Sequence, residues 1–363
     1  MFSSTKLVTT VACLQLCDKG MASLDDADLV RHHVPELEAT QVITGFDEQG
    51  NEQMEDVRNP ITLRLLLSHT SGFCYYSNDA NITRWHDKHG FDWRFLKANT
   101  TVARYQTPLA FQPGAKWHYG TGIDWAGILV TRVTGRSLED YFQEFIFRPM
   151  KMTSTSFLPN ASIKERMMSL TQNLDNMGIT AYPDNFDSIP FGLDRESDPD
   201  KVGPCFAGGA GLLSTALDYL AMLRGIMASA ANDDGSSDSA LLSSGSFREL
   251  FHDSIPSDAD RSYLLEAMTG QTYHDPILLR EKEDGIKRTG HSVGLLLNFV
   301  DSCYGRRAGS GCWDGAAKTQ YWLDPVTGLA GVCMTNIFGP NPNPFFKLYN
   351  DVERAAYDAL SSK

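Results

Sequence analysis

The first 26 residues, MFSSTKLVTTVACLQLCDKGMASLDD (Met1–Asp26), decide how the rest of the chain is interpreted. An early lysine, an apolar run and small residues after it are typical of a secretory signal peptide. The same stretch contains Ser3 and Lys6, an S-x-x-K pair. Two threonines and a glutamine interrupt the apolar run, which favours a structural helix over a signal sequence. We therefore expect a helix over residues 3–19, capped by one of the two leading serines and ended by Gly20.

The S-x-x-K pair has a chemical meaning on such a helix. Residues i and i+3 share a helix face, so the Lys6 ammonium can reach the Ser3 hydroxyl. A serine hydroxyl is a weak nucleophile until a base removes its proton. Lysine can be that base only if its pKa falls from about 10.4 toward about 7, a cost of about 4 kcal/mol that burial and a nearby positive field can supply. The alternative is a capped helix with a surface lysine.

The composition limits the classes of function. The chain has 363 residues, of which 42% are hydrophobic and 21% charged, and its net charge is −13. An acidic chain without a basic cluster is unsuited to nucleic acid or an anionic membrane, and its apolar runs are too short to span a bilayer. The seven cysteines are scattered without a C-x-x-C motif, which predicts buried free thiols in a reducing, cytoplasmic compartment.

Helices and strands are segregated along the chain. Helical patterns follow Pro60, the Gly-rich turn of residues 119–121 and Thr215, and short apolar stretches separated by turn residues begin near residue 288. Ser137 and Thr215 each precede an aspartate by three residues, which is a capping pattern. This segregation predicts an α+β fold with an antiparallel sheet. The sequence 231–246 is typical of a polar loop.

A second candidate nucleophile is Ser292, in the G-x-S-x-G sequence of residues 290–294. The nucleophile elbow of α/β-hydrolases needs an apolar strand before the serine and a helix after it. Here a polar stretch precedes the serine and a strand-like LLLNFV follows. We expect Ser292 to be an ordinary strand residue.

Two later motifs can complete a site around Ser3. Tyr119 lies in a Gly-rich turn before a helix, and a phenol beside a lysine can relay a proton. Trp313, Gly315 and Ala316 come just before the strand-like QYWLDP, and a glycine there lets backbone approach a ligand closely. The alternative to a site role for Trp313 is that its side chain only packs in the hydrophobic core.

In this order, SSTK, YGT and WDG resemble the S-x-x-K, Y-x-N and K-T-G/W-x-G motifs of the serine β-lactamase-like superfamily. The chain is most similar to class C β-lactamases, the related family VIII esterases and fungal lovastatin-type acyltransferases. Segments such as ITLRLLLSHTSGF, FQPGAKWHYGTGIDWAG and GGAGLLSTALDYLAML extend the likeness over nearly the whole chain. The resemblance implies an antiparallel sheet flanked by helices (1–24 and 136–363) with an inserted all-helical domain (25–135).

The resemblance also implies a site and a reaction. Ser3 is expected to be the acylated nucleophile, with Lys6 and Tyr119 as the proton-transfer pair. The backbone N–H groups of Ser3 and Ala316 form the expected oxyanion hole, and the expected substrate contacts are Thr121, Trp313 and Gly315. The implied enzyme is a serine esterase or acyltransferase acting on a small ester or thioester, with an acyl carrier as one candidate donor, and we expect no metal or other cofactor.

Two substitutions and the start of the chain depart from the family pattern. Thr121 replaces the usual asparagine, which argues against β-lactam hydrolysis. Trp313 replaces a cationic residue; together with Trp117, Tyr321 and Trp322 it suggests a hydrophobic acyl group or acceptor. Lys318 begins a K-T-Q that is too close to the next turn to be the third motif.

The third departure concerns the start of the chain. Family members carry tens of residues before the nucleophile and this chain has two, so we expect an N-terminally truncated protein that lacks the first sheet strands. An open sheet edge, poor stability and little activity would follow. The alternative function is therefore a non-catalytic, β-lactamase-like binding protein.

Overall fold

The computed structural model describes residues 1–90, 102–173, 178–182, 205–233, 237–270, 275–339 and 344–361. Its main sheet is antiparallel, in the order β5-β6-β7-β8-β9. The strands of this sheet are β5 (Thr289–His291), β6 (Leu296–Asn298), β7 (Gly311–Trp313), β8 (Thr319–Asp324) and β9 (Leu329–Met334). The expected α+β class with C-terminal strands is therefore confirmed.

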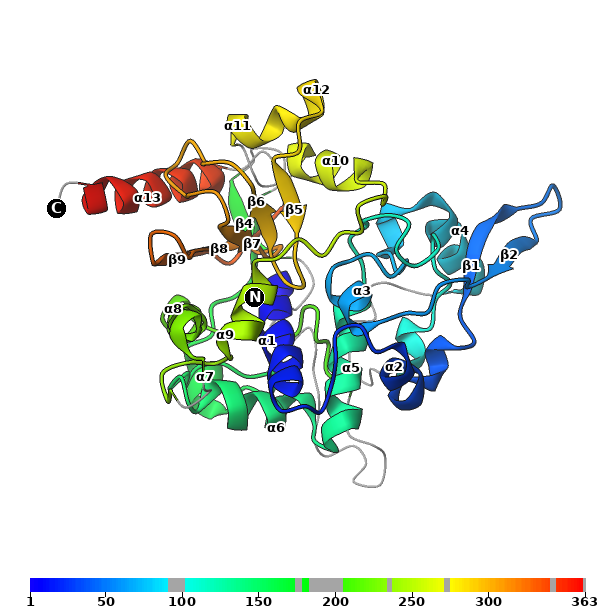
Figure 1. Cartoon of the computed structure of the whole chain (residues 1–363), viewed down its shortest axis with the longest axis horizontal. Coiled ribbons are helices and arrows are strands. Elements are labelled where there is room, and N and C mark those ends of the chain that lie inside the picture. Colours follow the sequence, from blue (N-terminus) through cyan, green and yellow to red (C-terminus); the bar gives the residue numbers. More distant parts are fainter. Residues whose placement is uncertain are drawn as a thin grey trace.

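Helices surround this sheet (Figure 1). The helices are α1 (Thr5–Asp18), α2 (Ala27–His33), α3 (Leu63–Leu67), α4 (Ala80–His89), α5 (Gly122–Thr134), α6 (Leu138–Phe142), α7 (Ala161–Glu165), α8 (Ala216–Ala228), α9 (Ser244–Leu250), α10 (Ser262–Gly270), α11 (Pro276–Leu279), α12 (Glu281–Asp284) and α13 (Pro344–Ser361). A small sheet joins β10 (Ile337–Phe338), β3 (Thr171–Asn173) and β4 (Ile179–Ala181).

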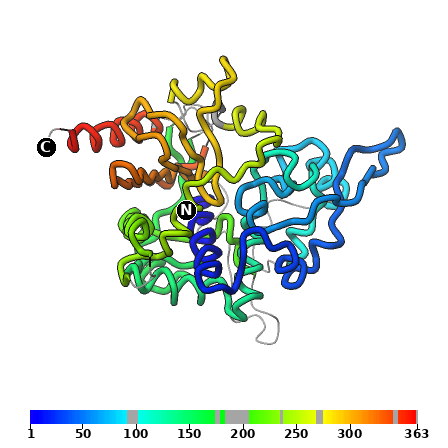
Figure 2. Tube along the Cα trace, viewed as in Figure 1, coloured from blue at the N-terminus to red at the C-terminus, as the bar shows by residue number. Residues whose placement is uncertain are grey.

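Helix α1 runs through the middle of the molecule, with the N-terminus beside the main sheet (Figure 2). Residues 5–14 and residue 16 are at most 1% exposed, so the helix is buried on all sides and not along a single stripe. This explains its sequence, because a helix surrounded by protein needs apolar or satisfied side chains around its whole circumference. The two threonines that interrupt the apolar run, Thr9 and Thr10, donate to the carbonyl oxygens of Gly208 and Val293.

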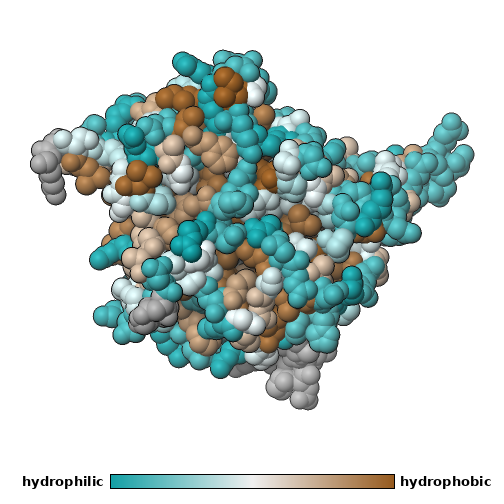
Figure 3. Space-filling view, in the orientation of Figure 1, coloured by the Kyte–Doolittle hydropathy of each residue, from teal (hydrophilic) through white to brown (hydrophobic). Residues whose placement is uncertain are grey.

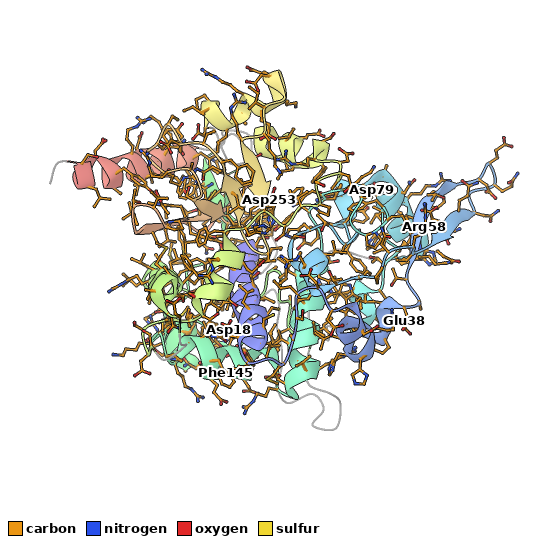
Figure 4. The ribbon with its side chains drawn as sticks, viewed as in Figure 1. Asp18, Glu38, Arg58, Asp79, Phe145 and Asp253 are labelled. Carbon is orange, nitrogen blue, oxygen red and sulfur yellow. The ribbon has the colours of Figure 1, made fainter. Side chains whose placement is uncertain are left out.

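The far end of α1 is fixed by a carboxylate. Asp18, labelled in Figure 4, accepts hydrogen bonds from the Ser243 N–H and from the hydroxyls of Ser243 and Ser246. These residues begin α9, so the aspartate caps a neighbouring helix and is favoured at its positive end. The expected end of α1 at Gly20 is confirmed, because this residue follows the C-cap at φ +67°.

The caps within helices α6 and α8 follow the sequence prediction. Ser137 accepts the Asp140 N–H, and Thr215 accepts the Asp218 N–H. The expected cap of α1 is wrong: Ser4 occupies the cap position but makes no side-chain bond to the helix. Its hydroxyl instead lies 2.8 Å from that of Thr319 on β8.

Residues 25–135 contain α2 to α5 and also a strand pair that the sequence analysis did not foresee. Strands β1 (Gln41–Phe46) and β2 (Glu52–Asp56) form a hairpin that extends from one side of the molecule (Figure 1). Figure 3 shows this hairpin covered mainly by hydrophilic residues, whereas apolar residues gather over the body of the protein. Strand β2, Glu52–Asp56, is polar, and the buried residues of β1, Val42 and Ile43, are consecutive and do not alternate with exposed ones, so the hairpin gave no strong strand signal.

The state of the cysteines and the character of the helices can be compared with the expectation of free thiols and of no membrane-spanning segment. All seven cysteines are free thiols; Cys13, Cys74 and Cys312 are buried, whereas Cys303 is exposed, against the expectation. No helix within the described ranges combines the length and the apolar character that a membrane crossing requires. The polar loop expected at 231–246 lies partly outside the described residues, and α9 begins within it.

Candidate functional site

The S-x-x-K pair lies where the tip of α1 meets the main sheet. Ser3 belongs to a single 3-10 turn, Phe2–Ser4, that leads into α1, and its side chain is partly exposed. Lys6 follows one turn later and is 1% exposed. The nucleophile candidate is therefore accessible while the lysine is enclosed.

Ser3 Oγ receives two hydrogen bonds. The Tyr119 hydroxyl donates to it over 2.6 Å, and Lys6 Nζ donates over 3.3 Å. Tyr119 comes from the turn before α5, so 116 residues of chain separate the two ends of the shorter bond. The structure thus brings together all three residues that were expected to carry the reaction.

Lys6 differs from the expectation in its protonation. Nζ donates to Ser3 Oγ, to Tyr75 Oη at 3.0 Å and to the Gly209 carbonyl at 2.8 Å, which uses all three ammonium protons. Burial alone lowers the pKa of Lys6, but the phenols of Tyr119 and Tyr75 and the carboxyl of Asp124 raise it, and the net direction is upward. The expected fall of the lysine pKa toward 7 is therefore wrong.

Tyr75 is a site residue that sequence reasoning missed. Its oxygen accepts from Lys6, and its ring centroid lies 5.2 Å from that of Tyr119. Burial raises the pKa of Tyr75, so it stays a neutral phenol. Nothing in the local sequence CYYSND distinguishes Tyr75 from its neighbour Tyr76, because only the packing of distant segments places one of them on the lysine.

The third motif also approaches the tip of α1. A Cβ at Gly315 would lie 2.1 Å from the Met1 carbonyl oxygen and 3.2 Å from Ser4 Oγ, so only glycine fits. The Gly315 N–H bonds the Thr319 carbonyl. Ala316, in contrast, is exposed. Within the part of the chain that the structure describes, its N–H donates no hydrogen bond. An open N–H in this turn is what a second oxyanion donor requires.

The other residues that were expected to contact the substrate differ in their relation to Ser3 and Lys6. Trp313 ends β7, and its ring centroid is 5.3 Å from that of Tyr119, so it borders the site. Thr121 precedes α5 and is partly exposed, but no hydrogen bond between its side chain and Ser3 or Lys6 is recorded in the described part of the chain. Lys318 donates to the Gly339 carbonyl and not to a residue of the site, which agrees with the expectation that its K-T-Q sequence is not the third motif.

Other aromatic residues near the motifs are core residues. Trp117, Tyr321 and Trp322 are at most 2% exposed, so they lie in the hydrophobic core, and the hydrophobic acyl group or acceptor that these aromatics suggested stays a prediction. Each contributes to a buried hydrophobic cluster. Of the four aromatics first considered, only Trp313 is partly exposed beside the reactive group.

Two buried histidines, His69 and His291, lie near Tyr119. The His69 ring centroid is 4.7 Å from that of Tyr119 and 5.3 Å from that of His291. Burial lowers the pKa of His291 to about 4 and that of His69 well below its ordinary value. Both rings are therefore neutral near pH 7 and add no cation to the site.

Ser292 is structural. It is fully buried in the turn between β5 and β6, and its hydroxyl accepts the N–H groups of Gly294 and Leu295. A nucleophile must be reachable by substrate, so the G-x-S-x-G sequence is a turn and not a nucleophile elbow.

Comparisons with known proteins show the family of the chain. A β-lactamase family model matches residues 1–356. The chain is 32% identical to lovastatin esterase of Penicillium rubens over 91% of its length and 77% of the relative's. It is 29% identical to monacolin J acid methylbutanoyltransferase of Aspergillus terreus over 90% of its length and 74% of that protein's.

Solved structures give the same result. Unliganded simvastatin synthase from Aspergillus terreus superposes with a TM-score of 0.78 at 25% identity, covering 100% of this chain and 84% of that one. A penicillin-binding protein from Bacillus halodurans shares the fold with a TM-score of 0.61 at 15% identity, covering 99% of this chain and 85% of that one. The resemblance drawn from the three motifs is confirmed, and the chain belongs to the β-lactamase family.

Proposed function

We propose that the protein is a serine acyl-enzyme hydrolase or acyltransferase that cleaves or transfers the acyl groups of hydrophobic esters or thioesters. The observation that supports this most directly is the partly exposed Ser3 Oγ, held 2.6 Å from the Tyr119 phenol and 3.3 Å from the Lys6 ammonium. Among its relatives, one is named an esterase and others acyltransferases. These names support an acyl-transfer reaction for this chain.

In the proposed acylation, Tyr119 first releases to solvent the phenol proton that it directs at Ser3 Oγ, and the resulting phenolate, stabilised by the Lys6 cation, acts as the base. Ser3 Oγ attacks the acyl carbonyl carbon while its proton passes to the Tyr119 oxygen, and an Oγ–C bond forms. The tetrahedral intermediate places its negative oxygen at the N–H groups of Ser3 and Ala316. When the bond to the leaving group breaks, Tyr119 returns the proton to the departing alkoxide or thiolate.

Lys6 has an electrostatic part in this scheme. Because its pKa is raised, it remains a cation and stabilises negative charge on the two oxygens beside it, Ser3 Oγ and Tyr119 Oη. Deacylation repeats the steps in reverse: an acceptor attacks the acyl-enzyme and releases Ser3. Water as the acceptor yields the free carboxylic acid, and an alcohol yields a new ester. The same residues therefore serve hydrolysis and transfer, and the acceptor that reaches the acyl-enzyme decides between them.

The proposed substrates are apolar. Trp313 stands where other family motifs carry a cation, and Lys318 is occupied elsewhere. Among the described residues, neither position 313 nor Lys318 therefore offers a cation to a substrate carboxylate. Small polyketide esters of secondary metabolism fit this character and the names of the relatives.

A covalent probe tests the proposal. The protein is incubated with a fluorescent alkyl fluorophosphonate, digested and mapped by mass spectrometry, with Ser3→Ala as the matched variant. We expect the adduct on Ser3 and no labelling of Ser3→Ala. An adduct on Ser292, or a folded wild-type protein without any adduct, would overturn the proposal, and the latter result would point to a non-catalytic binding protein.

A second measurement separates hydrolysis from transfer. The protein is given p-nitrophenyl butyrate with and without an apolar secondary alcohol, and butyric acid and the new ester are quantified by chromatography. An ester fraction that rises with alcohol concentration while p-nitrophenol release stays constant indicates a shared acyl-enzyme partitioned between two acceptors.

A further inference from the structure

A buried carboxylate lies behind the lysine, on the side away from Ser3. Asp124 belongs to the first turn of α5 and is 4% exposed. Its Oδ1 accepts the Gly209 N–H at 3.0 Å and the Tyr105 hydroxyl at 3.2 Å. No lysine or arginine of the described residues forms a direct ion pair with it, although a carboxylate enclosed in protein needs an opposite charge nearby.

One residue of backbone, Gly209, connects Asp124 to the buried cation Lys6. Gly209 gives its N–H to Asp124 and its carbonyl oxygen to Lys6 Nζ, at 3.0 and 2.8 Å. The donor end of this residue thus faces the negative group and the acceptor end faces the positive group, so both contacts are favourable. A Cβ at Gly209 would lie 2.6 Å from Asp124 Oδ2, so the contact depends on glycine.

The groups around Lys6 and Asp124 support an electrostatic role for the aspartate. Burial lowers the pKa of Lys6, whereas the phenols of Tyr119 and Tyr75 and the Asp124 carboxyl raise it. Of these three, only a carboxylate is anionic at neutral pH without special assistance. The titratable groups that face the pair are Tyr75, Tyr119 and His69 at the lysine end and Tyr105 and Cys205 at the carboxylate end.

We propose that Asp124 is a positioning residue that, through the backbone of Gly209, keeps Lys6 charged and aimed at Ser3 and Tyr119. This rests on the proposed acyl-enzyme function. Asp124 does not touch Ser3, so it acts on the reaction only by way of the lysine. Without its charge, the lysine loses its proton more readily and no longer stabilises the oxygens that develop negative charge.

The test is Asp124→Asn, which removes the charge but keeps an oxygen that can accept from Gly209 and Tyr105. The second-order rate of Ser3 labelling by the fluorophosphonate is followed from pH 5 to pH 11. We expect the alkaline limb of labelling to start about one pH unit lower, because an anion near a lysine raises its pKa by about that much. At pH 7, where the lysine stays charged, we expect labelling to be about tenfold slower because Lys6 is no longer aimed at Ser3 and Tyr119. A purely structural loss would lower the rate without moving the limb.

Two variants provide controls. Tyr105→Phe removes one hydrogen bond to the carboxylate but leaves its charge, so its alkaline limb should stay in place. Asp324→Asn changes a second buried aspartate that also accepts from a tyrosine and from backbone, but at Tyr357 and Arg307. That variant should label Ser3 at the wild-type rate at every pH.

The outcomes distinguish the two proposals. Wild-type labelling of Ser3 with an unchanged rate and limb in Asp124→Asn overturns the role of Asp124 alone, whereas absence of a Ser3 adduct in the wild type overturns the proposed function. Should Asp124→Asn not fold, the side-chain ¹⁵N signal of Lys6 in the wild type, assigned with Lys6→Arg, decides. An ammonium that persists above pH 10.4, the ordinary lysine value, supports the proposal; titration below that pH refutes it.

Discussion

Replacing Tyr119 by phenylalanine removes one oxygen from the site. That oxygen is 2.6 Å from Ser3 Oγ, and it is the atom that takes the serine proton in the proposed reaction. A well-placed general base contributes a factor of about 10² to 10⁴. Tyr119→Phe should therefore lower kcat/KM by this factor, which corresponds to about 3 to 5 kcal/mol of transition-state free energy.

The same change should affect folding much less. The phenylalanine ring keeps the contacts of the tyrosine ring with Tyr75, His69 and Trp313, whose centroids lie 4.7 to 5.3 Å away. Only one hydrogen bond is lost, worth about 0.5–1.5 kcal/mol of unfolding free energy. The loss of activity should thus exceed the loss of stability severalfold when both are expressed as free energies.

The assay is hydrolysis of p-nitrophenyl butyrate at saturating and limiting substrate, together with urea unfolding of the same preparations. Tyr141→Phe is the matched control, because the Tyr141 ring, like that of Tyr119, lies beside a lysine ammonium, here that of Lys19, but away from Ser3. It should keep wild-type kcat/KM. A Tyr119→Phe enzyme within tenfold of the wild-type kcat/KM would refute the assignment of Tyr119 as base.

Three further predictions concern packing, charge and pH. Gly315→Ala places a Cβ 2.1 Å from a backbone oxygen and should cost about 1–3 kcal/mol of stability and most of the activity, whereas Gly245→Ala, with 3.5 Å of room, should change neither; urea unfolding and ester hydrolysis check both. Glu353→Ala leaves the buried Arg306 without its 2.8 Å partner and should lower the unfolding free energy by about 3–5 kcal/mol, a loss that a wild-type urea midpoint would contradict. Burial lowers the pKa of His291 from 6.5 to about 4, so its neutral form stabilises the fold above pH 6.5 and this stability is lost as the pH falls toward 4, by roughly 2 kcal/mol at pH 5. His291→Gln should flatten the fall in melting temperature between pH 7 and pH 4.5, and an equally steep fall in that variant would count against the assignment.

Local sequence patterns predicted a good part of this structure. The 3-residue spacing of Ser3 and Lys6 placed both on one helical turn, because that spacing needs no information from elsewhere in the chain. The cap of α6 by Ser137 and the end of α1 at Gly20 are likewise local. Motif order also led to Tyr119 and to the β-lactamase family.

Other features depended on contacts between segments far apart. The sequence suggested a lysine of lowered pKa, but the structure surrounds Lys6 with acceptors from residues 75 and 209 and a carboxyl from residue 124. The predicted cap of α1 by Ser3 or Ser4 failed for the same reason, because the Ser4 hydroxyl at the cap position bonds Thr319 on β8 instead. Side-chain charge depends on the groups within a few ångströms, whatever their distance along the chain.

The sequence by itself therefore determined the family, the α+β class and the serine–lysine pair, because each of these is written in short-range spacing and motif order. Tertiary structure alone decided that Tyr75 joins the lysine, and that Lys6 is a cation. The physical reason is that pKa values and hydrogen bonds are properties of a three-dimensional neighbourhood, which the fold assembles from residues that no local pattern connects.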